Sequence, residues 1–104
     1  MTFEVRFSPA ARGDLVRLHE HLLARAESVE ELQLADHAVD EIELSCRVQL
    51  ARTPYIFRKA GKSPTRRELI IPFGATGYVA LYEIASASSV VVLAVRHQRE
   101  EDYH

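Results

Sequence analysis

The run that most constrains the fold lies near the C-terminus, where seven residues without a charge, 89–95, lead directly into Arg96 and His97. Uncharged runs rich in valine and leucine are typical of strands that are buried on both faces of a sheet. The abrupt change to cationic and titratable side chains marks the point at which such a strand emerges into solvent. The sequence therefore predicts an inner strand with a candidate functional edge at its end.

A strand and two helices are predicted upstream of this run. Alternating apolar and charged residues predict a first strand over residues 2–7. Ser8 followed by proline is a helix start, and Ser28 with Glu31 three residues later forms a capping box that opens a second helix. Apolar residues then recur at spacings of three and four, as Ala11, Leu15, Leu18 and Leu22 in the first helix and as Leu32, Ala35, Val39, Ile42, Cys46 and Leu50 in the second. This pattern predicts an antiparallel helical hairpin whose inner face covers a sheet.

Three more strands are predicted after Pro54, which ends the second helix because proline cannot continue it. Residues 55–65 are interpreted as an exposed basic loop, and the strands follow over 67–72, 78–85 and 89–96. The turns between them are a five-residue connection over 73–77 that contains two glycines and a shorter one over 86–88. The expected architecture is β-α-α-β-β-β in the α+β class, an antiparallel sheet with a helical hairpin on one face. The length suits a single domain over residues 1–104.

Composition narrows the cellular setting. The N-terminus lacks the pattern of a signal peptide, and no apolar run approaches the roughly twenty residues of a membrane span. We therefore expect a cytoplasmic protein that does not associate with membranes. The single cysteine, Cys46, falls on an apolar position of the second helix and is interpreted as a core residue. No spacing of histidine, cysteine and carboxylate residues suits a metal, so neither a metal nor another cofactor is expected.

The charges are unevenly distributed along the chain. Residues 27–43 contain seven acidic residues and no Lys or Arg, whereas residues 47–67 contain seven basic residues and no acid. A basic flank can attract an acidic protein segment or a phosphate backbone. The alternative interpretation is two solvated faces that balance each other.

The order of these elements, with two short motifs, resembles the ParE/RelE superfamily of bacterial toxins over nearly the whole chain. The motifs are Gly77-Tyr78-Val79-Ala80-Leu81-Tyr82 in the middle strand and Val95-Arg96-His97-Gln98-Arg99 at the end of the last one. The resemblance implies the toxin of a type II toxin–antitoxin (plasmid stabilisation) system, which a cognate antitoxin wraps and neutralises. RelE-type members cut messenger RNA on the ribosome, whereas ParE-type members poison DNA gyrase and have no known hydrolytic chemistry.

The resemblance also suggests how to choose between these activities. His97 and Tyr103 match the last-strand and C-terminal residues of the ribonucleases, so these two and Arg67 are the catalytic candidates if the chain is a metal-independent endoribonuclease. The ribonucleases usually have an arginine directly after the Gly-Tyr of the middle strand, where this chain has Val79. An aliphatic side chain cannot stabilise the charge on a phosphate, and this difference favours the ParE branch.

The favoured hypothesis is a ParE-like toxin that inhibits growth by binding DNA gyrase. Its surface for the target or the antitoxin is predicted to consist of Arg58, Lys59, Lys62, Arg66, Arg67, Arg96 and Arg99. Arg66 and Arg67 must point to opposite faces if both lie in a strand, so at most one can enter a shared groove. Two alternatives remain open: a RelE-like ribonuclease that acts on mRNA at the ribosome, and a non-toxic homologue that only binds an antitoxin.

Overall fold

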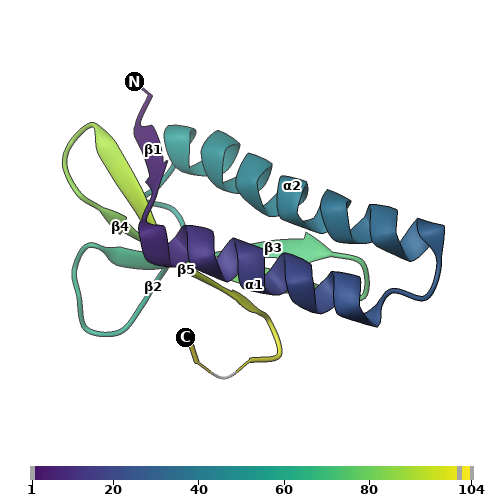
Figure 1. The fold of residues 1–104 in the computed structure, drawn as a ribbon. Helices are drawn as coiled ribbons and strands as arrows, with labels where there is room; N and C mark the ends of the chain where they lie inside the picture. Colours follow the sequence, from purple (N-terminus) through teal and green to yellow (C-terminus); the bar gives the residue numbers. More distant parts are fainter. Residues whose placement is uncertain (1, 101, 104) are drawn as a thin grey trace.

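The computed structural model describes residues 2–100 and 102–103, and in it two helices cover one face of a five-stranded sheet (Figure 1). In chain order the elements are β1 (Glu4–Phe7), α1 (Pro9–Arg25), α2 (Val29–Arg52), β2 (Arg58–Lys59), β3 (Arg66–Phe73), β4 (Thr76–Ile84) and β5 (Ser89–His97). The predicted α+β class and the helical hairpin are confirmed. Within residues 2–100 and 102–103, neither helix has the length and hydrophobicity that a membrane span requires.

The sheet is mixed, whereas the sequence predicted an antiparallel one. Its strand order is β1-β5-β4-β3-β2, with β1 parallel to β5 and every other neighbouring pair antiparallel. Parallel neighbours need a crossover connection. The helical hairpin carries the chain from β1 at one edge of the sheet to β2 at the other, and β3 and β4 return it to β5. This arrangement makes β5 an inner strand, as predicted.

Both helix starts are capped as predicted. The Ser8 Oγ accepts a hydrogen bond from the Ala11 N–H at 3.1 Å, and the Ser28 Oγ accepts one from the Glu31 N–H at 3.1 Å. The Glu31 side chain accepts a further bond from the N–H of Glu27 at 2.6 Å, which also fixes the link between the helices. These bonds satisfy donors that the first turn of a helix leaves without an intrahelical partner.

The loop prediction for residues 55–65 is wrong at two positions. Arg58 and Lys59 form β2, opposite Glu68 and Arg67 of β3. Two residues are too few to show a strand periodicity in the sequence, and β2 exists because β3 offers it backbone partners.

The connection between β3 and β4 is also shorter than predicted, since only Gly74 and Ala75 lie outside the two strands. Gly74 has a φ of 60°, which permits the tight turn. The other glycine, Gly77, is needed for space, because a Cβ there would lie 2.5 Å from the backbone oxygen of Ile71.

The core lies between the helices and the sheet. Its largest fully buried side chains include Ile42, Cys46 and Leu50 from α2 and Leu69, Ile71, Tyr82, Val90, Val92 and Val95 from the strands. Leu32 was predicted in this stripe but is 44% exposed, because the first turns of α2 extend past the end of the sheet (Figure 1). The prediction that β5 is buried on both faces is also too strong, since Val91 and Leu93 on its other face are only partly buried.

Candidate functional site

The cationic end of β5 is divided between the two faces of the sheet. Successive strand residues point to opposite faces. His97 lies opposite Tyr78 and follows the buried Val95 on the helix-covered face, whereas Arg96 lies opposite Val79 on the other face, here called the open face. Arg96 and His97, although adjacent in the sequence, therefore lie on opposite faces of the sheet.

Glu68 of β3 organises the open face. Its carboxylate lies 2.9 Å from the Arg58 Nε and 4.0 Å from an Nη of Arg96, and it accepts a hydrogen bond from the Tyr103 hydroxyl at 2.6 Å. The guanidinium carbon of Arg96 also lies 5.1 Å from the centre of the Tyr103 ring. Tyr103 is thus held on the open face, and Glu68 offsets the positive charge of both arginines.

These contacts define the state of Tyr103. Burial raises the pKa of its hydroxyl, and the hydrogen bond to Glu68 and the charge of that carboxylate raise it further, against the opposing charge of Arg96. A phenol that donates to a carboxylate keeps its proton at neutral pH. Tyr103 is therefore a hydrogen-bond donor in this arrangement and is poorly suited to act as a base.

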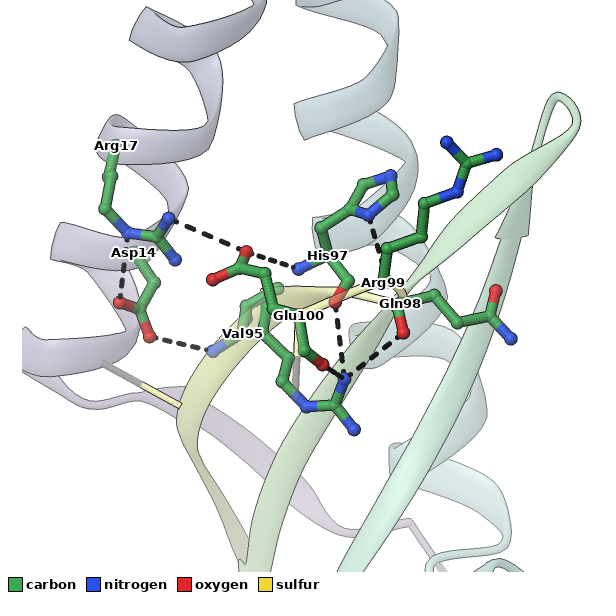
Figure 2. Close-up of polar contacts among 8 residues, drawn as sticks. Asp14, Arg17, Val95, His97, Gln98, Arg99 and Glu100 are labelled. Atoms are coloured by element: carbon green, nitrogen blue, oxygen red, sulfur yellow. Dashed lines mark hydrogen bonds and ion pairs between the residues drawn. The ribbon is translucent and has the colours of Figure 1, made fainter. Parts of the chain in front are cut away.

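His97 is held on the helix-covered face by both ring nitrogens. Its Nδ1 accepts a hydrogen bond from the backbone N–H of Arg99 at 3.1 Å (Figure 2), and its Nε2 lies 3.1 Å from the Thr76 Oγ1. The ring packs edge-on against Tyr78, with 5.5 Å between centroids. Because a backbone N–H can only donate, Nδ1 must present a lone pair, which places the proton of the neutral ring on Nε2.

Electrostatics also favour the neutral form of His97. Burial lowers the pKa of its imidazole, the nearby charges of Arg99 and His21 lower it further, and Glu100 opposes them. At neutral pH the ring is therefore uncharged, and neither nitrogen is available for proton transfer unless a present hydrogen bond breaks.

Arg67, the third catalytic candidate, lies elsewhere. It shares the helix-covered face with Leu69, and its Nη1 donates to the backbone oxygen of Phe57 at 2.7 Å. It is level with Tyr82, four residues along β4 from the partner of His97, which corresponds to about 13 Å along the sheet. The structure thus places His97, Tyr103 and Arg67 in three separate environments.

The predicted binding cations do not form one patch either. Arg66 lies on the open face with its Nε 3.5 Å from Glu83, so Arg66 and Arg67 point to opposite faces as predicted. Lys59, Lys62 and Arg99 are exposed. Across the described part of the chain, no three histidine, cysteine or carboxylate side chains come together as a metal site requires.

Sequence reasoning missed the side chains that protect the edge of β5. β1 pairs with β5 only as far as Val92, so the backbone beyond needs other partners. The Asp14 carboxylate accepts a hydrogen bond from the Val95 N–H at 2.9 Å, and the Glu100 carboxylate accepts one from the His97 N–H at 2.9 Å (Figure 2).

Arg17 lies between these two carboxylates, 3.9 Å from Asp14 and 3.7 Å from Glu100 (Figure 2). A signal for Asp14 was present in the sequence, because it follows Ala11 by three residues and precedes Leu18 by four, on the apolar stripe of α1. Glu100 follows the last strand without any such periodicity, so the sequence contains no signal for its role.

Comparisons with known proteins agree on the fold and the family. Residues 5–102 match the family model described as "ParE toxin of type II toxin-antitoxin system, parDE". Toxin RelE3 of Caulobacter vibrioides is 42% identical over 96 residues, covering 92% of this chain and 95% of that protein.

Two solved structures share the fold. The chromosomal ParDE toxin–antitoxin system from P. aeruginosa has a TM-score of 0.71 at 14% identity, covering 92% of this chain and 96% of that one. The RelBE2 toxin–antitoxin complex from Mycobacterium tuberculosis has a TM-score of 0.56 at 25% identity, covering 93% and 99%. With nearly its whole length matched by the family model, this chain belongs to the family of ParE toxins of type II toxin–antitoxin systems.

Proposed function

We propose that this toxin inhibits growth by binding DNA gyrase, without cutting nucleic acid, and that a cognate antitoxin neutralises it. The observation that supports a binding mode is the separation of His97 and Tyr103 on opposite faces of the sheet, each with its polar atoms already hydrogen-bonded.

Metal-free RNA cleavage needs a base, an acid and a cation around one phosphate. On the open face, Tyr103 donates to Glu68, a carboxylate that would repel a phosphate. Val79 stands where the ribonucleases usually have an arginine, and Arg67 is on the other face. These groups do not surround a common point, which favours the gyrase-binding hypothesis.

A RelE-like ribonuclease is the second candidate, since the relative from Caulobacter vibrioides has the name Toxin RelE3. Tyr103 and Arg96 are in contact, and Arg58 lies beside them through Glu68. For cleavage, Glu68 would have to release both the hydroxyl and the guanidinium groups when RNA binds.

Antitoxin binding is proposed because the structural neighbours come from toxin–antitoxin systems. The edge of β3 is one docking surface, since β2 covers only Arg67 and Glu68 within the described residues and Ile70 is 40% exposed. An extended antitoxin segment could add a strand there. The predicted cations, among which Lys59 and Lys62 are exposed, would attract an acidic segment or the target.

Induction of the chain in bacteria tests this proposal when plasmid supercoiling and transcript integrity are measured in parallel. We expect growth arrest and relaxed plasmid with intact transcripts, and we expect Tyr103→Phe to arrest growth as fully as the parent chain. His37→Gln, an exposed histidine on α2, is the matched surface control for His97→Gln.

Three outcomes would contradict parts of the proposal. Cleaved transcripts that disappear with Tyr103→Phe or His97→Gln, but not with His37→Gln, would establish the ribonuclease alternative. Normal growth on induction would indicate a non-toxic homologue. Failure of the chain to capture the protein encoded beside it would remove the antitoxin hypothesis.

A further inference from the structure

A cavity of about 460 Å³ lies between the second half of α1, the start of β4 and the end of β5. This volume is in the range of small-molecule sites. Cationic and hydrogen-bonding side chains from three parts of the fold line it, namely Arg17, His21, Arg25, Thr76, His97 and Arg99. Leu18, Leu22 and Tyr78 supply its apolar wall.

The lining has an excess of positive charge. Three arginines face it against one carboxylate, that of Glu100, and Asp14 reaches Arg17 from one side at 3.9 Å. Burial is the main reason why the pKa of His97 is lowered, and the charges of Arg99 and His21 lower it further against the opposing charge of Glu100. An anion would meet favourable charge on entering this cavity.

Arg17 provides independent support for an anion at this place. Its Nε and one Nη are buried and have no hydrogen-bond acceptor among the residues that the structure describes. Its ion pairs, at 3.9 Å and 3.7 Å, are longer than hydrogen bonds. Buried donors without acceptors are unfavourable, and an oxyanion beside Arg17 would supply the acceptors.

We propose that this cavity binds a phosphate group, held by Arg17, Arg25 and Arg99. Guanidinium groups match the geometry of phosphate oxygens and remain charged at any physiological pH. The phosphate could be inorganic phosphate or part of a small phosphorylated metabolite whose organic portion packs on Leu18, Leu22 and Tyr78. The site is distinct from the open face and does not depend on which target the toxin binds.

His97 gives the site a specific readout. The polar and charged groups that face its ring or line the same cavities are Arg17, His21 and Arg25 from α1, Glu31 from α2, Thr76 and Tyr78 from β4, and Arg99 and Glu100 after β5. A bound anion stabilises the imidazolium, so phosphate should raise the pKa of His97. By linkage, protonation of this ring should strengthen the binding of phosphate in a given charge state.

The test is an NMR titration of the His97 ring in the purified full-length chain, in chloride and in inorganic phosphate at equal ionic strength. We expect a saturable shift and a higher His97 pKa in phosphate. Arg25→Gln and Arg99→Gln should each weaken phosphate binding about tenfold, the usual effect of losing one charge-assisted hydrogen bond. Arg52→Gln removes an exposed arginine at the other end of the hairpin and should leave binding unchanged.

Binding of adenosine monophosphate and of adenosine, measured in the same way, distinguishes a phosphorylated metabolite from free phosphate as the ligand. Tighter binding of the nucleotide than of inorganic phosphate assigns a phosphorylated metabolite, and equal binding assigns free phosphate. The proposal is overturned if the His97 pKa is the same in both salts, if Arg52→Gln weakens binding as much as Arg25→Gln, or if adenosine binds as tightly as its monophosphate. Thermal unfolding of each variant verifies that the fold is intact.

Discussion

At the scale of single residues, Asp14 and Ser8 act as a substitute for a neighbouring strand. Beyond β1, the Val92 oxygen accepts from the Ser8 N–H, the Leu93 oxygen accepts from the Ser8 hydroxyl, and Asp14 accepts from Val95. Asp14 is only 6% exposed, so its charge is stabilised by this hydrogen bond and by Arg17. The start of α1 therefore closes the edge that the short β1 leaves open.

Replacement of Asp14 should show how much this contact matters. Asp14→Ala leaves the Val95 N–H and Arg17 without their partner, and we expect a loss of about 2–4 kcal/mol in the free energy of unfolding. Asp36→Ala, which breaks only the exposed pair with His19, should cost less than about 1 kcal/mol. Urea unfolding of both variants measures the difference, and equal losses would mean that Asp14 does not support the sheet edge.

The neutral His97 predicts a pH dependence of stability. Its pKa in the folded chain is below the ordinary value of 6.5, so the unfolded chain takes up the proton first. Above 6.5 both states are neutral and His97 contributes no slope. As the pH falls below 6.5, stability should decrease until the folded pKa is reached.

His97→Gln should remove this slope, because glutamine has no charge to gain. Unfolding free energies of the parent and the variant, measured in urea from neutral to mildly acidic pH, give the contribution of His97 as a difference. If the parent chain instead becomes more stable relative to His97→Gln as the pH falls, the folded state favours the imidazolium.

At the scale of elements, the β3–β4 hairpin depends on a glycine that does not need an unusual φ. A Cβ at position 77 would lie 2.5 Å from the Ile71 oxygen and 3.0 Å from Oε1 of Gln98. The Gln98 N–H also donates to the Gly77 oxygen at 2.9 Å, so the backbone is held on both sides. The start of β4 cannot move away without losing its pairing to β3 or its contact with the turn after β5.

Two alanine substitutions should therefore have opposite effects. Gly77→Ala should destabilise the chain by about 1–3 kcal/mol, the usual cost of overpacking. Gly13→Ala, in the interior of α1 with open space around it, should stabilise it by about 1 kcal/mol. Thermal unfolding shows the two shifts directly, and a Gly77→Ala variant as stable as the parent would mean that β3 and β4 separate freely at this end.

The elements that the sequence predicts well are those whose signals come from residues close together in the chain. Each helix cap, at Ser8 or Ser28, joins residues only three positions apart. The apolar residues of α1 and α2 recur every three or four positions, so a short window of sequence reveals both features. The parallel pairing of β1 with β5 joins segments about 85 residues apart, and β2 depends wholly on β3. Such pairings depend on tertiary packing, for which a short window holds no signal.

The candidate site shows the same division. Alternation along a strand is enough to predict that Arg66 and Arg67 point to opposite faces of the sheet. His97 and Tyr103 are only six residues apart in the sequence, which suggested a common site. The turn after β5 takes Tyr103 to the open face, and Glu68, which holds it there, comes from a different strand.

At the scale of the whole molecule, α2 packs against α1 and against three strands of the sheet, β1, β3 and β5. Cys46 is fully buried at the centre of this interface, as the apolar pattern of the helix predicted. Burial raises the pKa of its thiol to about 12, so almost no reactive thiolate exists at neutral pH. The thiol can be modified only if the helix separates from the sheet.

Thiol labelling therefore reports whether the fold opens as one unit. We expect the native chain to resist iodoacetamide and to react when urea unfolds it, with the labelling and the loss of helical circular dichroism sharing one midpoint. A Val48→Cys variant in a Cys46→Ala background places a thiol two residues further along α2, at a position that is 48% exposed, and it should react at once in the native state. Labelling of Cys46 well below the unfolding midpoint would mean that α2 leaves the sheet while the rest stays folded. Because α2 packs against both β1 and β3, such a local opening would also expose the helix-covered face of the sheet. A shared midpoint therefore tests whether the helices and the sheet unfold together.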